Sequence, residues 1–427
     1  MRPPEPSVVY RGYRTELDPT RMQVAAFLKH AGTSRWTFNW GLQRKIETYR
    51  DGKTATRFDL EKELAARKQT DLQWLGDVSK CARQEALRDL DFAFGTFYRS
   101  LHGGRKTGFP KFKKRRLTAT SFRFSGDAVK VERTRIRLPR IGWVRLKEAE
   151  YLPTGGVHLV AATVSERAGR WFIGLTVGHE VLSPPPNRGP IAGLDVGVAR
   201  LATLSDGTTF DPHGEFGRLK ARLRRTQRSM CRRRRGSANW RKSARAVARI
   251  QMRIANVRAD RTHKITTELT RTKSLIVVED FRAQALGRNR RMSHALWNAG
   301  LAELLRQLTY KAKWRGGSVV VAPMFFPSTK RCSSCGSVGP EVPLAQRLFI
   351  CAACGLEMDR DENAAKNLSQ LAASPADSNA CGEDVRPYLA AVLVEAGTAF
   401  GGGRSSWKMT FNANEGTDRN AAAGAIR

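Results

Sequence analysis

The sequence predicts a multidomain α/β protein, and three observations lead to that expectation. Helical patterns fill residues 21–109, strand-like patterns fill residues 110–182, and from Ile191 onward short strands alternate with helices. A module of four paired cysteines interrupts this last region. The chain has 427 residues, enough for roughly two to four domains.

The first half of the chain divides into a helical segment and a β-rich segment. Thr20 and Gln23 have the spacing of a capping box, so a helix is expected to begin there. Helical periodicity continues through residues 60–67 and 80–98, until glycines and Pro110 interrupt it. Apolar residues then recur at strand-like intervals, which predicts strands near residues 122–124, 136–146, 157–163 and 171–177.

The second half begins after a linker. Residues 183–190 contain four prolines and can continue neither a helix nor a central strand. Two strands around Gly197 predict a hairpin, and Asp206-Gly207 predicts a further turn. The remaining expected elements are a basic helical stretch at 218–270, a strand at 274–278, a helix at 297–314, a strand at 318–322 and a helix at 362–371. Residues 375–427 are expected to be mostly disordered.

The charge balance points to a polyanionic partner. There are 75 Lys and Arg residues against 39 Asp and Glu, a formal net charge of +36. A hydrophobic fraction of 41% argues against a wholly disordered chain. Because basic side chains that neutralise phosphates release counterions, nucleic acid is the first candidate partner and an anionic membrane surface the second.

The chain is expected to be cytoplasmic. Its first residues carry Pro3, Pro4 and Pro6 and lack the apolar run of a secretory signal. Nowhere do eighteen consecutive apolar residues occur, so no membrane span is expected. Seven cysteines are an odd number, which favours metal ligation in a reducing compartment over a disulfide framework.

The cysteine module predicts a structural zinc site. Cys332 and Cys335 form one C-x-x-C pair, and Cys351 and Cys354 form the second after fifteen intervening residues. A glycine follows each pair and lets the backbone turn so that both thiolates point inward. Four thiolates close the tetrahedral shell, so Zn²⁺ here should stabilise the fold and not activate water. The other cysteines, at 81, 231 and 381, are expected to be unligated thiols.

Three separated acids are candidates for a hydrolytic metal site. Asp195 lies within an apolar strand, Glu279 and Asp280 end another, and Asp359 and Asp361 open the last helix. Singly they could be a turn acid, a solvated strand end and a helix N-cap. Together they could bind Mg²⁺, and two such ions would suit phosphodiester hydrolysis. The sequence contains no phosphate-binding loop and no serine nucleophile motif that would favour other chemistry.

Two basic clusters are candidates for nucleic-acid contact. Residues 218–261 hold seventeen Lys or Arg and one acid. The candidate nucleic-acid contacts in this segment are Arg222, Arg225, Arg232, Arg233, Arg234 and Arg235. A solvated helical face is the alternative for this run. The second cluster contains Lys111, Lys113 and Lys114 beside two phenylalanines, which could stack on bases or belong to the core.

These residues resemble a known family. The segments Gly193-Leu194-Asp195-Val196-Gly197, Val278-Glu279-Asp280 and Asp359-Arg360-Asp361-Glu362-Asn363, together with the four cysteines, resemble the split RuvC core of the transposon-encoded TnpB proteins. These proteins are similar to the type V CRISPR effectors. The resemblance extends over about residues 10 to 372, and the stretch from Gly401 onward matches nothing expected of the family.

The resemblance implies a domain plan. A RuvC (RNase H-like) nuclease domain would occupy residues 191–331 and 355–374, with the zinc ribbon inserted at 332–354. A helical recognition region at 21–109 would interrupt a β-rich wedge domain formed by residues 1–20 and 110–182.

The resemblance also implies an activity. The chain would be an RNA-guided DNA endonuclease of a mobile element, guided by a structured RNA from the transposon end. It would cut double-stranded target DNA beside a short adjacent motif, and Asp195, Glu279 and Asp361 would be its Mg²⁺-binding catalytic triad. No membrane and no obligate protein partner are implied. The alternatives are an RNA-guided repressor that does not cut and a zinc-ribbon RNA-binding protein; the three intact acids argue against both.

Overall fold

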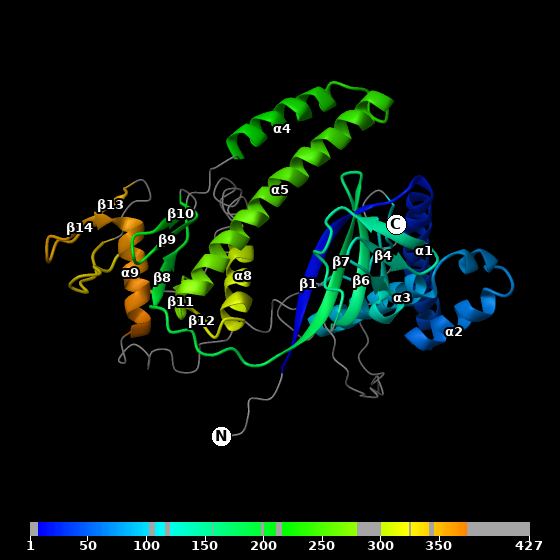
Figure 1. Cartoon of the computed structure of the whole chain (residues 1–427), viewed down its shortest axis with the longest axis horizontal. Coiled ribbons are helices and arrows are strands. Elements are labelled where there is room, and N and C mark those ends of the chain that lie inside the picture. Colours follow the sequence, from blue (N-terminus) through cyan, green and yellow to red (C-terminus); the bar gives the residue numbers. More distant parts are fainter. Residues whose placement is uncertain are drawn as a thin grey trace, which may run out of the picture. The chain divides into compact units, whose positions relative to one another are not determined.

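The computed structural model describes residues 7–101, 107–115, 120–155, 157–197, 200–210, 216–279, 300–323, 326–340 and 346–373. Three sheets lie within these residues, with seven, five and two strands (Figure 1). The expected disordered tail at 375–427, Cys381 and Asp280 lie outside the described residues.

The helical segment is built as the sequence predicts. Its helices are α1 (Arg21–Arg50), α2 (Arg57–Arg67) and α3 (Lys80–Leu101), with a short 3-10 helix at Gln73–Asp77. The capping box of α1 is confirmed, because the Gln23 amide donates to Thr20 Oγ1 at 3.3 Å and the Thr20 amide donates to Gln23 Oε1 at 3.0 Å. Apolar side chains of all three helices, among them Leu42, Leu60 and Leu90, form one buried cluster.

The β-rich segment forms the seven-stranded sheet, and the N-terminal residues join it. The strand order is β2-β6-β7-β1-β5-β4-β3. The bounds are β1 Ser7–Asp18, β2 Ser121–Ser125, β3 Lys130–Val131, β4 Arg135–Leu138, β5 Gly142–Leu146, β6 His158–Arg167 and β7 Arg170–Val181. β1 runs antiparallel to β7 from the Ser7–Val181 pair to the Leu17–Trp171 pair. The expected strands at 122–124, 136–146, 157–163 and 171–177 are therefore present.

The proline-rich linker is fastened at Asn187. Its amide donates to the Gly316 carbonyl at 3.0 Å, and its side-chain Nδ2 donates to the carbonyls of Thr270 at 3.2 Å and Lys273 at 3.0 Å. The linker is therefore fixed to the ends of the elements that follow it in the chain.

The five-stranded sheet has the order β10-β9-β8-β11-β12. Its strands are β8 (Ala192–Asp195), β9 (Ala202–Leu204), β10 (Thr209–Phe210), β11 (Leu275–Val278) and β12 (Ser318–Val321). β11 runs parallel to both β8 and β12. The two predicted turns are confirmed, because β9 runs antiparallel to β8 and β10 runs antiparallel to β9.

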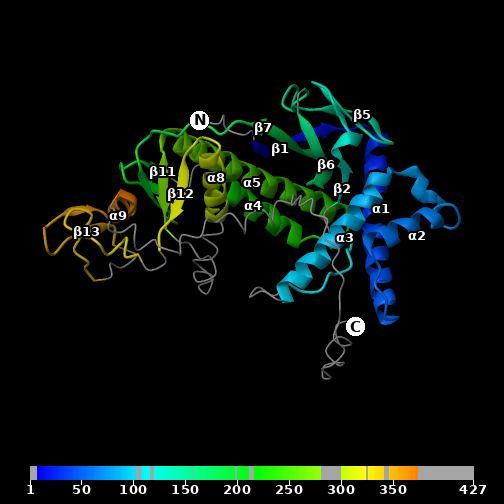
Figure 2. The same cartoon turned by 90° about the horizontal axis from the view of Figure 1, so that it is seen from below.

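Helices cover both faces of this sheet. Ile276 and Val278 of β11 pack against α5 (Ala238–Thr272) and α8 (Leu301–Lys313). Val277, which points to the opposite face, packs against Leu368 of α9 (Arg360–Ala373). α4 (Phe216–Cys231) forms a helical hairpin with α5, and Figure 2 shows the two side by side.

Within the described part of the chain, no helix is both long enough and apolar enough to cross a membrane.

Candidate functional site

The three predicted acids lie at neighbouring element ends. Asp195 is the last residue of β8, Glu279 follows β11 directly, and Asp361 is in the first turn of α9. β8 and β11 are parallel, with Val278 beside Leu194, so the next step along both strands brings Glu279 toward Asp195. Because side chains alternate along a strand, Asp195 points to the sheet face that α9 covers.

The electrostatics of Asp195 agree with this gathering. Burial raises the pKa of Asp195 to about 7, and the negative charges of Asp361 and Glu279 add to the increase. Arg360 and a hydrogen bond from the Val196 amide act in the opposite direction. Three carboxylates that are poorly solvated and repel one another favour a positive charge among them.

Basic and hydroxyl groups of the chain contact the same acids. Arg347 Nη1 lies 3.1 Å from Asp361 Oδ2, and Arg360 Nη2 lies 3.4 Å from Asp361 Oδ1. The hydroxyl of Ser328 donates to Glu279 Oε1 at 3.2 Å. Asp359 pairs with Arg200 at 2.8 Å and accepts from the Asp361 amide, so it acts as a helix N-terminal acceptor.

The acid cluster fits a hard divalent cation in its donor chemistry. Carboxylate oxygens are the ligands that Mg²⁺ takes in proteins, usually with several waters. His, Cys, Asp and Glu are the side chains that could bind a metal here. Within the described residues, only the four cysteines form a group of three or more whose ligand atoms all lie within 4.8 Å of one another. The acids are thus gathered less closely than the thiols, and Arg347 occupies part of the space around Asp361.

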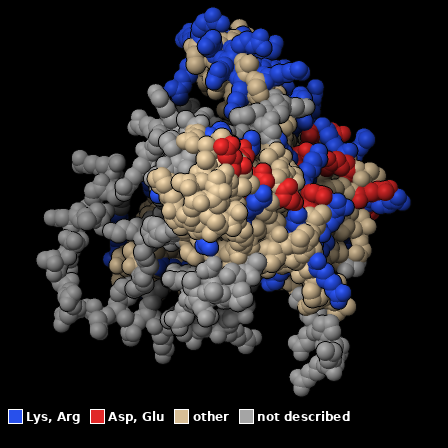
Figure 3. All heavy atoms as spheres, turned by 90° about the vertical axis from the view of Figure 1, so that its left-hand side faces the viewer, with Lys and Arg blue, Asp and Glu red and all other residues tan. Residues whose placement is uncertain are grey.

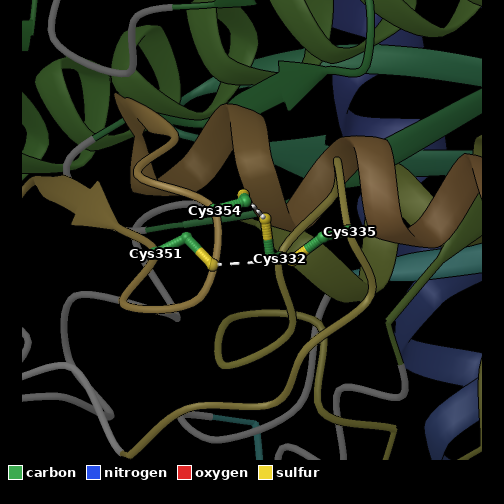
Figure 4. Close-up of side chains that lie close together, drawn as sticks. All are labelled: Cys332, Cys335, Cys351 and Cys354. Atoms are coloured by element: carbon green, nitrogen blue, oxygen red, sulfur yellow. Dashed lines mark hydrogen bonds between the residues drawn. The ribbon is translucent and has the colours of Figure 1, made fainter.

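The four cysteines converge as the spacing predicts. The distance between Cys332 Sγ and Cys354 Sγ is 3.6 Å, and that between Cys335 Sγ and Cys351 Sγ is also 3.6 Å (Figure 4). A tetrahedron with metal–sulfur bonds of about 2.3 Å has edges of about 3.8 Å. Thiol positions with these separations fit zinc.

The turns that aim the thiols depend on two glycines. Gly336 has φ +77° and Gly355 has φ +74°, a left-handed conformation that favours glycine. Their amides donate to the carbonyls of Cys332 at 3.0 Å and Cys351 at 2.9 Å. Strands β13 (Leu348–Ile350) and β14 (Glu357–Asp359) form the hairpin that leads from the second pair back to α9.

Two buried asparagines fasten this module to α9. Asn363 accepts from the Ser333 amide at 2.9 Å and donates to the Arg331 carbonyl at 2.7 Å. Asn367 donates to the carbonyls of Ser328 at 2.8 Å and Arg331 at 2.6 Å. Asn363 lies within one of the family-like segments, but neither asparagine was assigned a role from the sequence. The i, i+4 spacing of the asparagines, one helical turn after the acids, is the signal that could have found them.

The first basic cluster lies on the α4–α5 hairpin. The guanidinium-bearing residues Arg222, Arg225, Arg232, Arg233, Arg234 and Arg235 are all exposed. On the face drawn in Figure 3, Lys and Arg side chains gather at the top, where this hairpin lies in Figure 1. The apolar side of the hairpin is closed by Phe216, Leu219, Ile250 and Ile254, which leaves the arginines outward.

The lysines of the second cluster have different surroundings. Lys111 and Lys114 are exposed. Lys113 is partly buried, with its Nζ 3.9 Å from the ring centroid of Phe38 and 3.9 Å from Asp89 Oδ2. Burial lowers the pKa of Lys113. The backbone of Lys113 is also held by Asn39, at 2.7 Å and 3.0 Å. Its ammonium therefore faces the protein.

Three family descriptions match three separate parts of the chain. "Helix-turn-helix domain" matches residues 7–54, which form β1 and α1. "Probable transposase" matches residues 162–290. "Cas12f1-like, TNB domain" matches residues 302–368, which contain the four cysteines and Asp361.

Curated relatives match along nearly the whole chain. "Putative RNA-guided DNA endonuclease InsQ" of Escherichia coli (strain K12) is 35% identical over an alignment of 394 residues, with 88% of this chain and 95% of the relative covered. A "Putative RNA-guided DNA endonuclease" of Streptomyces pristinaespiralis is 32% identical over 390 residues, with 89% and 92% covered.

A more distant similarity reaches the CRISPR effectors. "CRISPR-associated endodeoxyribonuclease Cas12f1" of Sulfoacidibacillus thermotolerans is 24% identical over 221 residues, about half of each chain. A solved Cas12f1–sgRNA–target DNA complex aligns with 84% of this chain at 14% identity, with a TM-score of 0.33, which is too low to describe this fold.

Proposed function

This chain belongs to the TnpB family of RNA-guided DNA endonucleases, and from that premise we propose that it uses a guide RNA to cut target DNA for a mobile element. The observation that carries the proposal is geometric: Asp195 and Glu279 stand at the ends of two paired parallel strands, and Asp361 stands in the first turn of α9, which covers the sheet face to which Asp195 points. Carboxylates from three separate elements at adjoining ends suit metal-assisted phosphodiester hydrolysis.

In this proposal the three acids hold Mg²⁺. Bound there, two such ions would neutralise charge on the phosphate and stabilise the attacking and leaving oxygens. The acids themselves supply the negative ligands, and a cation bound beside Asp195 would lower its raised pKa and so favour its ionised form. Arg347 stabilises the charge of Asp361 when no other cation does so.

The four-cysteine module is proposed to bind one structural zinc ion. Its thiols close the coordination shell, so the ion would stabilise the knuckles and take no part in the cutting step. Asn363 and Asn367 of α9 both donate to the Arg331 carbonyl, so the stabilised module would also hold α9, which contains Asp361, in place.

The domain plan follows the same proposal. The five-stranded sheet with α5, α8 and α9 is proposed as the RuvC-like nuclease domain, interrupted by the zinc ribbon. The seven-stranded sheet is proposed as the wedge domain and α1–α3 as the recognition region.

Exposed basic side chains are proposed to hold the nucleic acids. The α4–α5 arginines carry the largest density of positive charge and are proposed to contact the guide–target heteroduplex through its phosphates. Arginine suits this task because its planar head binds phosphate in a bidentate manner. Lys111 and Lys114 are proposed as further phosphate contacts.

The test is to purify the chain with its copurifying RNA, sequence that RNA, and assay cutting of a target matched to its variable end. We expect one transposon-end species, cutting beside a short adjacent motif, and full loss of cutting in Asp195→Ala with unchanged RNA binding. Asp260→Ala is the control, since Asp260 is exposed and pairs only with its helical neighbour Lys264 at 2.8 Å among the ion pairs of the described residues. Bulk cellular RNA would favour a plain RNA-binding protein, and target binding without cutting by the wild type would favour a repressor.

A further inference from the structure

A buried serine contacts one of the three acids. Ser328 is 1% exposed and lies in the turn of residues 327–331, just before the first zinc-site cysteine. Its hydroxyl donates to Glu279 Oε1 at 3.2 Å, across 49 residues of sequence. The turn is closed by its own backbone, since the amides of Lys330 and Arg331 both donate to the Pro327 carbonyl. The backbone that carries Ser328 is therefore held in place beside Glu279.

The same turn is held from behind by α9. Asn367, 1% exposed, donates through both hydrogens of Nδ2, to the Ser328 carbonyl at 2.8 Å and the Arg331 carbonyl at 2.6 Å. Asn363, one helical turn earlier, donates to the Arg331 carbonyl at 2.7 Å. Both asparagine side chains are buried, so bulk water cannot replace these hydrogen-bond partners. The turn of residues 327–331 is therefore fixed to α9.

α9 thus places two acids at once. Asp361 stands on its first turn, and Asn367 on its second turn places Ser328, which in turn contacts Glu279. We infer that Ser328 is a positioning residue for Glu279, and that Asn367 keeps Ser328 in place, so the turn leading into the zinc ribbon helps to build the catalytic centre. This inference rests on the proposed role of Glu279.

The physical reason is orientation of a metal ligand. A hydrogen bond from an outer partner fixes the orientation of a carboxylate that binds a cation and tunes its affinity. Loss of such an outer partner typically weakens metal affinity by about 10- to 100-fold. The hydroxyl of Ser328 is suited to this role because it is a buried neutral donor within hydrogen-bond distance of an anion.

The experiment compares Ser328→Ala, Ser328→Thr and Ser333→Ala in the full chain assembled with its RNA. Ser328→Ala should raise the Mg²⁺ concentration for half-maximal cutting by about tenfold, with target binding and zinc content unchanged. Ser328→Thr retains the hydroxyl and should restore the wild-type Mg²⁺ dependence. Ser333→Ala is the matched control, because the Ser333 hydroxyl lies in the same module but points to Met358 Sδ at 3.4 Å.

A second readout needs no cutting. Mn²⁺ binding to the zinc-loaded, RNA-free chain, followed by the electron paramagnetic resonance of free Mn²⁺, should weaken in Ser328→Ala and in Asn367→Ala, but not in Ser333→Ala. Glu279→Ala gives the upper limit of the effect. Melting temperature and zinc content are measured on every variant, and Asn367→Ala decides the matter if Ser328→Thr does not fold.

The outcomes are separable. If the wild type cuts, Glu279→Ala does not, and Ser328→Ala shows wild-type Mg²⁺ dependence and Mn²⁺ affinity, the positioning role is wrong while the nuclease proposal stands. If the wild type does not cut and Glu279→Ala leaves Mn²⁺ affinity unchanged, the nuclease proposal itself fails. A Ser328→Ala chain that loses zinc would show that the serine supports the ribbon and not the acid.

Discussion

Gly193 of β8 and Ala365 of α9 touch backbone to backbone. A Cβ atom on Gly193 would lie 1.8 Å from the Ala365 carbonyl oxygen and 2.6 Å from the Ser369 amide nitrogen. Since neither atom belongs to a flexible side chain, α9 can lie this close to the sheet only beside glycine. Gly193 is two residues before Asp195, and Ala365 is four residues after Asp361, so this contact sets the approach of one acid to the other.

Gly193→Ala should therefore push α9 away from β8 and abolish most of the cutting. We expect a loss of stability of about 2 to 4 kcal/mol, in the range of severe core overpacking, measured by urea unfolding beside the cleavage assay. Gly12→Ala is the matched control, because Gly12 is also a strand glycine and has no heavy atom within 4 Å of its would-be Cβ. Full cutting by Gly193→Ala would contradict the importance of the contact.

Asp195→Asn should stabilise the chain in buffer without added magnesium while it abolishes cutting. The folded-state pKa of Asp195 is raised to about 7, so the free energy of unfolding falls as pH rises from about 4 to 7. The free energy of unfolding of the variant does not fall in this way, so at pH 8 it should exceed that of the wild type by about 2 to 4 kcal/mol. The difference between the two chains should shrink toward pH 4. Unfolding titrations across this range measure it.

Asp206→Asn should change the stability of the chain in the opposite direction to Asp195→Asn. Burial acts to raise the pKa of Asp206, but the hydrogen bond from Lys273 prevails and lowers it to about 2. Its stabilising effect is present at neutral pH and is lost as pH falls from about 4 to 2. The substitution should therefore lower stability at pH 8, and equal behaviour of the two variants would contradict the electrostatic account of Asp195.

Zinc should be present at about one ion per chain after dialysis, and Cys332→Ser should lose it. Cys332 is fully buried among its three partners, so loss of this ligand exposes the knuckle to proteolysis. Metal analysis and limited proteolysis measure both effects. Cys231→Ser is the control, because Cys231 is exposed and lies outside the four-thiol group. A wild-type chain without zinc would remove the assignment.

The two classes of lysine near residue 111 should respond differently. Replacing Lys111 and Lys114 by Gln should reduce the slope of log affinity against log salt for RNA by roughly 1.4 to 1.8 if each contacts a phosphate, with no change in melting temperature. Lys113→Gln should instead destabilise the fold by about 1 kcal/mol, because its ammonium packs on Phe38. An unchanged salt slope in the double variant would exclude Lys111 and Lys114 as contacts.

Local patterns predicted much of this structure. The capping box at Thr20 and the glycines beside each cysteine pair act over four residues or fewer, and the structure confirms both. The position of Glu279 after a strand is likewise local, because this acid directly terminates an apolar run. The sequence predicts Asp195 within a strand, whereas it is the last residue of β8.

Contacts between distant segments could not be predicted in this way. Ser328 and Glu279 are 49 residues apart, and neither short motif reveals that they touch. The close backbone contact at Gly193 is likewise absent from any local pattern, because it arises where α9 crosses β8. Lys113 faces inward because it contacts Phe38 and Asn39 of α1. No pattern within residues 111–114 distinguishes it from Lys111 and Lys114.

The order of elements in the five-stranded sheet has a consequence for how this chain can change. β8, β11 and α9 contact one another directly, yet long excursions of the chain separate them in sequence, and α4 with the outer half of α5 lies on one of these. The hairpin tip at residues 232–236 is exposed and lies far along the chain from both Asp195 and Glu279. The length of the α4–α5 hairpin can therefore change: residues can be added or removed at its tip without shifting the strand ends that carry the acids.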